Sequence, residues 1–263
     1  MKSTNTKSGK KSRVNRSNIA LRYLLSFPFV LAILTVGSQA QKDDFRYPLW
    51  FLNQGELKCS SCAVGYAAAS IYPDSAFKVA YQNALMNYSL SQNVSISGGQ
   101  AFWSTETGTA WMGNDFTESG DSVEPAALRT MDKYEGKGFV LVLAGAADFK
   151  LEDGFRGVIS AGEVPPPVWT EKLPTGAEYL YAVGVAPEYF YEVSSWLEAE
   201  KSARRNVARS QFVRMKELQK YTRGDDQEMR TEELSLTLRN AQIVARWRDI
   251  KKKIFYVLTR SPL

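Results

Sequence analysis

The sequence predicts an α+β fold of two tandem units, each with a helix packed on a small antiparallel sheet. Three observations predict it: an internal repeat at a constant offset of 119 residues, a helical pattern of small and apolar residues in each copy, and alternating segments after the second helix. The elements of one unit should therefore have counterparts in the other.

The repeat aligns residues 48–91 with 167–210 without a gap, and 12 of the 44 positions are identical. Unrelated stretches would share roughly one position in sixteen, so chance is a poor explanation. Both copies begin with Pro-x-Trp and then contain Ala-Val-Gly-x-Ala, starting at Ala63 and Ala182. An internal duplication is the simplest interpretation.

Each copy of this motif is expected to be a strand that ends at Gly65 or Gly184, where a missing side chain suits a bend or a close backbone approach. A helix should follow, over about 74–92 in the first unit and 190–221 in the second. Small and apolar residues recur there at three- and four-residue spacing. They are Phe77, Ala80, Ala84 and Tyr88, then Trp196, Ala199, Ala203 and Val207.

A strand hairpin should close each unit. Residues 234–249 alternate like a strand around Asn240, and a turn at Lys251–Lys253 leads into a second strand at 254–260. Residues 138–145 are the expected counterpart of that second strand in the first unit.

The expected domain organisation has four parts. They are a signal peptide at 1–40, a first unit at 41–149, a Pro-rich linker at 150–166 that forms a stiff spacer, and a second unit at 167–263. Residues 94–124 are rich in Gly, Ser, Thr and Trp and are interpreted as a loop inserted into the first unit.

The signal peptide is predicted from a basic segment, the apolar run Tyr23–Val36 and the small residues that end at Ala40. We expect cleavage between Ala40 and Gln41. The apolar run is shorter than the roughly 20 residues that span a membrane, although an uncleaved anchor is the alternative. The mature chain is expected in the periplasm or associated with the outer membrane.

Charge and composition exclude several classes of function. Seven of the 33 basic residues lie in the leader, so the mature chain has 26 basic residues against 28 acidic ones, which argues against nucleic-acid binding. Residues 41–164 hold 9 basic and 15 acidic side chains, and residues 165–263 hold 17 and 13, so the two halves can attract within or between molecules. The chain has no histidine, which removes the usual general base and the commonest metal ligand.

The second half resembles a known family. The segments "PPPVW", "LYAVGVAPEYFYEVSSWLEAEKSARRNVARS" and "LRNAQIVARWRDIKKKIFYVLTR" resemble the LPP-twenty lipoprotein domain, named after a Helicobacter surface lipoprotein. The match covers 165–263 well and 46–146 loosely, but the lipobox cysteine of the family is missing. Relatives include flagellar proteins that form rings or collars near the outer membrane.

The resemblance implies an envelope structural or assembly protein. We therefore expect an exported, non-enzymatic component of a bacterial envelope complex, with no cofactor, metal or catalytic residue. Its expected partners are other envelope proteins, further copies of itself arranged head to tail, and the periphery of the outer membrane. The alternatives are a periplasmic thiol-disulfide protein that uses Cys59 and Cys62, and a ligand-binding module that uses tryptophans of the inserted loop.

Three sets of residues are candidate sites. Cys59 and Cys62 are expected to form a structural disulfide, with thiol exchange or metal binding as alternatives. The basic helix residues could bind an anionic partner or form a solvated face; they are Arg204, Arg205, Arg209 and Arg214. Trp103 and Trp111 could bind a glycan or a partner, or could pack against a sheet.

Overall fold

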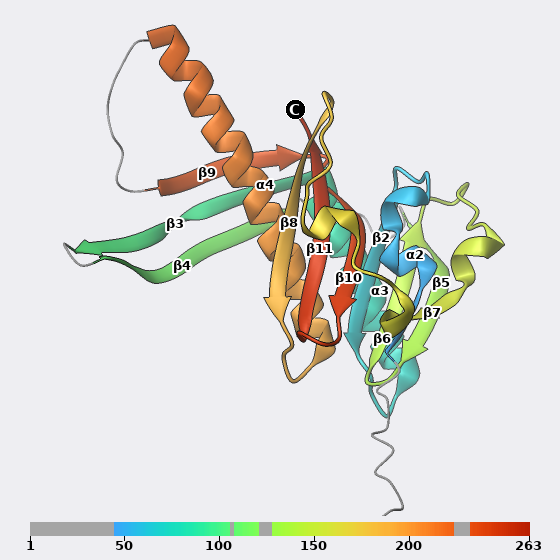
Figure 1. Cartoon of the computed structure of the whole chain (residues 1–263). Coiled ribbons are helices and arrows are strands. Elements are labelled where there is room, and N and C mark those ends of the chain that lie inside the picture. Colours follow the sequence, from blue (N-terminus) through green and yellow to red (C-terminus); the bar gives the residue numbers. More distant parts are fainter. Residues whose placement is uncertain (1–44, 106–107, 121–127, 224–231) are drawn as a thin grey trace, which may run out of the picture. The chain divides into compact units, whose positions relative to one another are not determined.

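The computed structural model describes residues 45–105, 108–120, 128–223 and 232–263 (Figure 1). The predicted signal peptide and its cleavage site at Ala40 lie outside these residues. The fold is α+β, as the sequence predicts. Within the described ranges, no helix is both long enough and apolar enough to cross a membrane.

Two long α-helices, one short α-helix and four 3-10 turns accompany eleven strands in the described residues. The strands and α-helices in chain order are β1 Arg46–Pro48, α2 Leu49–Leu52, β2 Cys62–Ala68, α3 Pro73–Gln92, β3 Asn93–Thr105, β4 Gly108–Gly120, β5 Arg129–Gly136, β6 Phe139–Gly145, β7 Val158–Ser160, β8 Tyr179–Pro187, α4 Glu192–Arg223, β9 Glu232–Arg239, β10 Gln242–Asp249 and β11 Ile254–Pro262. The two long helices begin and end within two residues of the predicted bounds.

Two three-stranded sheets have the same order of strands. The first is β2-β6-β5 and the second is β8-β11-β10, and every pairing in them is antiparallel. Helix α3 packs on β2 and β6, and helix α4 packs on β8 and β11. Each outer strand carries a register shift, between Thr130 and Asp132 in β5 and between Ile243 and Ala245 in β10.

Gly65 and Gly184 lie in the middle of their strands, so the prediction that the strands end there is wrong. Strand β2 continues to Ala68 and β8 to Pro187. The alternative role, a close backbone approach, is what the structure shows. A methyl group on Gly65 would collide with the backbone of Ala80 and Ala84 in α3.

Asparagine side chains of the helices bind the outer edge of the two sheets. Asn87 Nδ2 donates to the carbonyl oxygen of Val64 at 2.8 Å, and Asn206 Nδ2 donates to that of Val183 at 2.8 Å. β2 and β8 are edge strands, whose outward carbonyls would otherwise have no partner in a sheet. Asn87 and Asn206 are separated by 119 residues, the offset of the internal repeat, and each makes the same contact with its own sheet.

The segment interpreted as an inserted loop is instead a long β-hairpin. Strands β3 and β4 pair from Val94–Gly120 to Thr105–Gly108, and β3 also pairs with β9, which gives the order β4-β3-β9. The Gly, Ser and Thr content suggested a loop, but Val94 and Ile96 alternate with serines and are buried. Because β9 lies more than a hundred residues further along the chain, local composition could not reveal this pairing.

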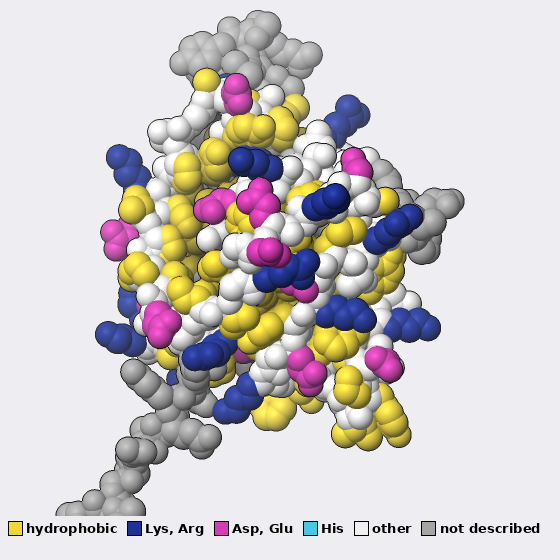
Figure 2. All heavy atoms as spheres, turned by 90° about the vertical axis from the view of Figure 1, so that its right-hand side faces the viewer, with side chains coloured by type: hydrophobic (Ala, Val, Ile, Leu, Met, Phe, Trp, Pro, Cys, Tyr) yellow, Lys and Arg dark blue, Asp and Glu magenta, His cyan; other side chains and the backbone are white. Residues whose placement is uncertain are grey.

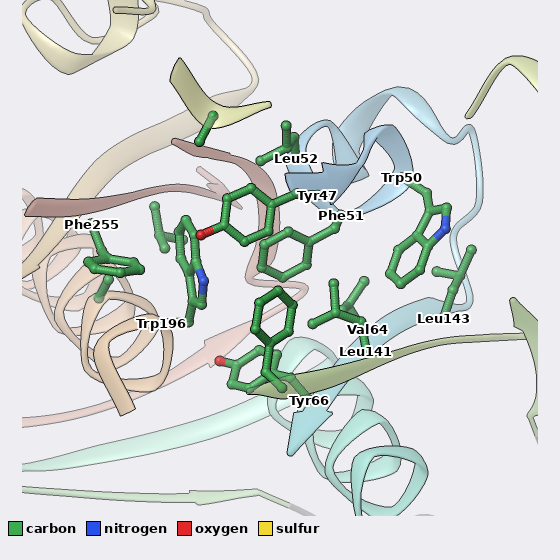
Figure 3. Close-up of a cluster of buried hydrophobic side chains, with 14 of the residues drawn as sticks. Tyr47, Trp50, Phe51, Leu52, Val64, Tyr66, Leu141, Leu143, Trp196 and Phe255 are labelled. Carbon is green, nitrogen blue, oxygen red and sulfur yellow. The ribbon is translucent and has the colours of Figure 1, made fainter. Parts of the chain in front are cut away.

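One aromatic core joins the two halves of the chain (Figure 3). Phe51 of α2 lies 5.2 Å from Trp196 of α4 between ring centroids, and Trp196 lies 4.7 Å from Phe255 of β11. Tyr66 of β2 contacts Phe51 from the other side. The face of the first sheet that α3 leaves open is therefore covered by α2 and by residues of the second half.

The expected linker packs against this core. Its strand β7 pairs with β1, the buried Ala161 donates its N–H to Phe45 at 2.7 Å, and the carbonyl of Val164 accepts from Trp247 at 3.1 Å. Residues 150–166 therefore hold the first and second halves together rather than keeping them apart.

Candidate interaction sites

Cys59 and Cys62 form a disulfide with Cα atoms 5.5 Å apart. Leu57 and Lys58 turn the chain just before it, and Lys58 has a φ of 49°, a left-handed conformation that is uncommon for a residue other than glycine. The chain turns again at Ser60 and Ser61, between the two cysteines, and this turn brings their Cα atoms within bonding reach, which an extended strand could not do. The disulfide leads into strand β2, whereas thiol-exchange pairs usually open a helix.

Arg204 is the most deeply buried of the predicted partner-binding arginines. Its guanidinium donates to Glu118 of β4 through Nε at 3.1 Å and Nη2 at 2.9 Å, and the side chains of Arg204 and Glu118 are 5% and 9% exposed. Burial lowers the pKa of Arg204, but the charges of Glu118 and Glu200 outweigh burial, so the net shift is upward. Arg204 therefore binds an acidic residue of the other half within the same chain and is not on the surface.

The other predicted arginines lie further along α4 with different surroundings. Arg205 pairs with Glu198 at 2.6 Å, and the Arg209 guanidinium lies 5.1 Å from the ring centre of Phe116 in β4. Arg214 is exposed. Arg204 and Arg209 together attach one side of α4 to the base of the β3–β4 hairpin.

Trp103 and Trp111 lie on the two strands of that hairpin. Trp103 pairs with Ala110, and Trp111 pairs with Phe102, so the two tryptophans occupy neighbouring positions of one ladder. They lie in a different sheet from the disulfide, because β3 and β4 belong to the sheet β4-β3-β9 and Cys62 begins β2 of the sheet β2-β6-β5. The structure thus does not bring the predicted sites together as one set.

A buried ion pair that the sequence does not predict joins α4 to β10. Arg246 of β10 donates to Glu200 of α4 at 2.7 Å, to the carbonyl of Phe51 at 2.9 Å and to Gln54 Oε1 at 3.0 Å. The one available signal was Glu200 itself, because it precedes Arg204 by one helical turn and adjoins the small residue Ala199.

A second missed cluster surrounds Arg248. It donates to Glu192 at 2.9 Å and to the hydroxyl of Tyr47 at 3.1 Å, and it also pairs with Glu188. Burial raises the pKa of Tyr47 well above 10.0, and burial also raises the pKa of Glu192 above 4.5. Arg246 and Arg248 are two residues apart on one strand, so both side chains enter the interior on the same face.

Strand β4 is an outer strand of the third sheet, β4-β3-β9, and is the longest unpaired backbone edge near Arg204 and Arg209. β4 spans 13 residues and, in the part of the chain that the structure describes, pairs with β3 alone. Its base is fixed by the contacts of Arg204 with Glu118 and of Arg209 with Phe116. Such an edge can pair with a strand of another chain.

Charged side chains elsewhere are mixed in sign. Figure 2 shows one face of the molecule, on which Lys and Arg side chains are interspersed with Asp and Glu. Among the described residues, no group of three or more His, Cys, Asp or Glu side chains is placed to hold a metal ion. Comparisons of the chain with protein families, with curated proteins and with solved structures give no match.

Proposed function

We propose that the chain is an exported, non-enzymatic component of a bacterial cell-envelope assembly, which associates with further copies of itself and with other envelope proteins. The observation that carries the proposal is the free edge of β4. The resemblance of residues 165–263 to the LPP-twenty domain supports the same interpretation, because relatives of that domain form rings or collars near the outer membrane.

The length of β4 supports a role in association. Strands in globular proteins are usually about 5 to 6 residues long, and long unpaired edges are normally shortened, bulged or covered because they recruit other strands. β4 has 13 residues, from Gly108 to Gly120. A second chain that pairs along this edge would gain backbone hydrogen bonds without any change in the fold.

The base of the hairpin is held in place before any partner binds. The Arg204–Glu118 pair is buried, and Val94, Ile96 and Leu238 at the start of the third sheet pack with Val207 and Ala208 of α4. An edge that is already ordered loses less conformational entropy on binding than a disordered segment would. Two of the four arginines expected to bind a partner, Arg204 and Arg209, thus support the proposed association surface from inside the same chain.

Two proline variants test the proposal, Asn114→Pro and Asp115→Pro. Neighbouring residues of an antiparallel strand direct their N–H groups to opposite edges, so one variant removes an N–H that faces β3 and the other removes one at the free edge. Thermal unfolding shows which of the two variants has lost the N–H that faces β3, because only loss of a hydrogen bond to β3 weakens the β3–β4 ladder. The other is the free-edge variant.

Sedimentation velocity at low and high salt then measures association. We expect the wild type to self-associate and the free-edge variant, with near-normal thermal stability, to lose this association. Both variants also serve as matched baits in envelope extracts, where only the free-edge variant should lose its partners. The proposal would be overturned if the wild-type protein were monomeric at low salt and if every partner that it recovered from the extracts also bound the free-edge variant.

A further inference from the structure

A cavity of about 300 Å³ lies beside the disulfide. Its walls come from both halves of the chain: the turn at 54–60 and the start of β2 on one side, and α4, β10 and β11 on the other. Cys59, Cys62 and Arg204 all line it. Residues from two of the predicted sites therefore meet here, and none of the lining residues belongs to β4.

The charged residues of the lining are all basic. They are Lys58, Arg204, Arg246 and Arg260, and no Asp or Glu belongs to the lining. Glu118 and Glu200, which are not part of the lining, pair with Arg204 and Arg246 and compensate two of the four charges. Lys58 and Arg260 form no salt bridge with any carboxylate of the described residues, so the cavity retains an excess of two positive charges.

The arginines are held by contacts that leave them facing the cavity. Arg246 is fixed by Glu200, by the carbonyl of Phe51 and by Gln54. Arg260 donates to Gln242 Oε1 through Nε at 3.3 Å and Nη2 at 3.0 Å, and its guanidinium lies 4.7 Å from the ring centre of Tyr179. An ordered guanidinium loses little conformational entropy when it binds an anion.

Lys58 is positioned by the backbone rather than by a side-chain partner. Its φ of 49° places it in the left-handed region, directly before the disulfide-closed turn. A residue other than glycine in this conformation is held there by its surroundings, and such positions are frequent in binding sites. The disulfide-closed turn that follows Lys58 thus fixes the backbone from which its side chain lines the cavity.

We infer that this cavity binds a small oxyanion that carries carboxylate or phosphate groups. The charged lining provides N–H donors, and the side chains of Ser60, Ser91 and Gln242 add neutral polar groups. The volume is at the lower end of the range of ligand pockets, which is roughly 300–1,000 Å³. It therefore suits one small ligand rather than a polymer. The inference does not depend on the proposed association through β4.

Isothermal titration calorimetry with the purified protein tests the site, with inorganic phosphate and succinate as separate probes at constant ionic strength set by sodium chloride. We expect saturable binding with at least one probe, and the stronger probe identifies the chemistry of the ligand. Binding of neither probe would overturn the inference.

Three variants locate the binding. Arg260→Gln removes one uncompensated charge, and Lys58→Asn removes the other while keeping a residue that tolerates a left-handed backbone. Each should weaken binding roughly ten- to hundred-fold, the usual effect of losing a hydrogen bond to a charged group. Lys252→Asn is the matched control, because that lysine is exposed and outside the cavity.

Circular dichroism and thermal unfolding show whether each variant is folded. Lys58 is exposed, so its variant should fold even if Arg260→Gln does not. Wild-type affinity in Lys58→Asn and Arg260→Gln, or equal weakening in Lys252→Asn, would show that the anion binds elsewhere and would overturn the inference.

Discussion

Glu200 and Arg246 form an ion pair 2.7 Å long in the interior of the protein, and each side chain is only 1% exposed. Glu200 comes from α4 and Arg246 from β10, and the arginine also donates to the carbonyl of Phe51 in α2. The pair therefore connects the second sheet, its helix and the first half of the chain at one buried point.

Removal of one member of this pair should be strongly destabilising. Arg246→Met leaves Glu200 buried with Arg204 as its nearest cation, 3.9 Å away, and an unpaired buried charge costs about 3–5 kcal/mol of unfolding free energy. The double variant Arg246→Met/Glu200→Leu should recover most of the loss, because neither member of the pair is then left buried without its partner, and Arg204 keeps Glu118. Urea denaturation of the three proteins measures this. The prediction would be contradicted if the unfolding free energy of Arg246→Met lay within about 1 kcal/mol of that of the wild type.

Two glycines should be equally intolerant of alanine. A Cβ at Gly184 would meet the backbone of Ala199 and Ala203, just as one at Gly65 would meet that of Ala80 and Ala84. Backbone atoms cannot rotate away, so we expect Gly65→Ala and Gly184→Ala each to lose at least about 1–3 kcal/mol, the usual cost of overpacking.

Gly154→Ala is the control for these variants, because nothing lies within 4 Å of the position a Cβ would occupy. It should leave the unfolding free energy nearly unchanged or raise it slightly. Chemical denaturation compares the three. If Gly184→Ala were as stable as Gly154→Ala, the close approach of α4 to β8 would be wrong.

Much of the fold followed from local patterns. The spacing of Ala80, Ala84, Ala199 and Ala203 predicted both long helices, and the turn at Lys251–Lys253 lies where it was expected, between β10 and β11. These features depend on neighbours within one or two helical turns or within one hairpin, which a single sequence displays directly.

The remainder depends on contacts between distant segments. Val94 and Ile96 are buried because β9 and α4 pack against their hairpin, and Arg204 is buried because Glu118 meets it there. A helical arginine next to alanines has the same local pattern whether it faces solvent or a carboxylate. The glycine-rich composition of the hairpin likewise suggested a loop.

The cavity beside the disulfide was likewise predictable from the sequence only in part. The CxxC spacing identified Cys59 and Cys62 as a pair, and the structure joins them. Nothing in the sequence near the cysteines indicates Arg246 or Arg260, which lie nearly two hundred residues away and arrive through β10 and β11. Only the packing of the two halves places their charges beside the disulfide.

Glu192 should give the protein a distinct dependence of stability on pH. Its carboxylate accepts hydrogen bonds from Arg248, Tyr47 and Trp196, but burial dominates and raises its pKa above the ordinary 4.5. The folded state therefore holds this proton more tightly than the unfolded state does. The stability from this group is complete below pH 4.5 and is lost as the pH rises through the raised pKa.

The variant Glu192→Gln isolates this effect, because glutamine keeps the size of the side chain and does not titrate. We expect the unfolding free energy of the wild type, relative to that of the variant, to decrease from pH 4 toward pH 7, over roughly the range in which a raised carboxyl pKa lies. Denaturant unfolding at several pH values measures the difference. Glu198→Gln is the matched control, since Glu198 lies on the same helix, is partly exposed and also pairs with an arginine. A wild-type advantage that grows with pH would mean that the arginine, rather than burial, determines the titration of Glu192.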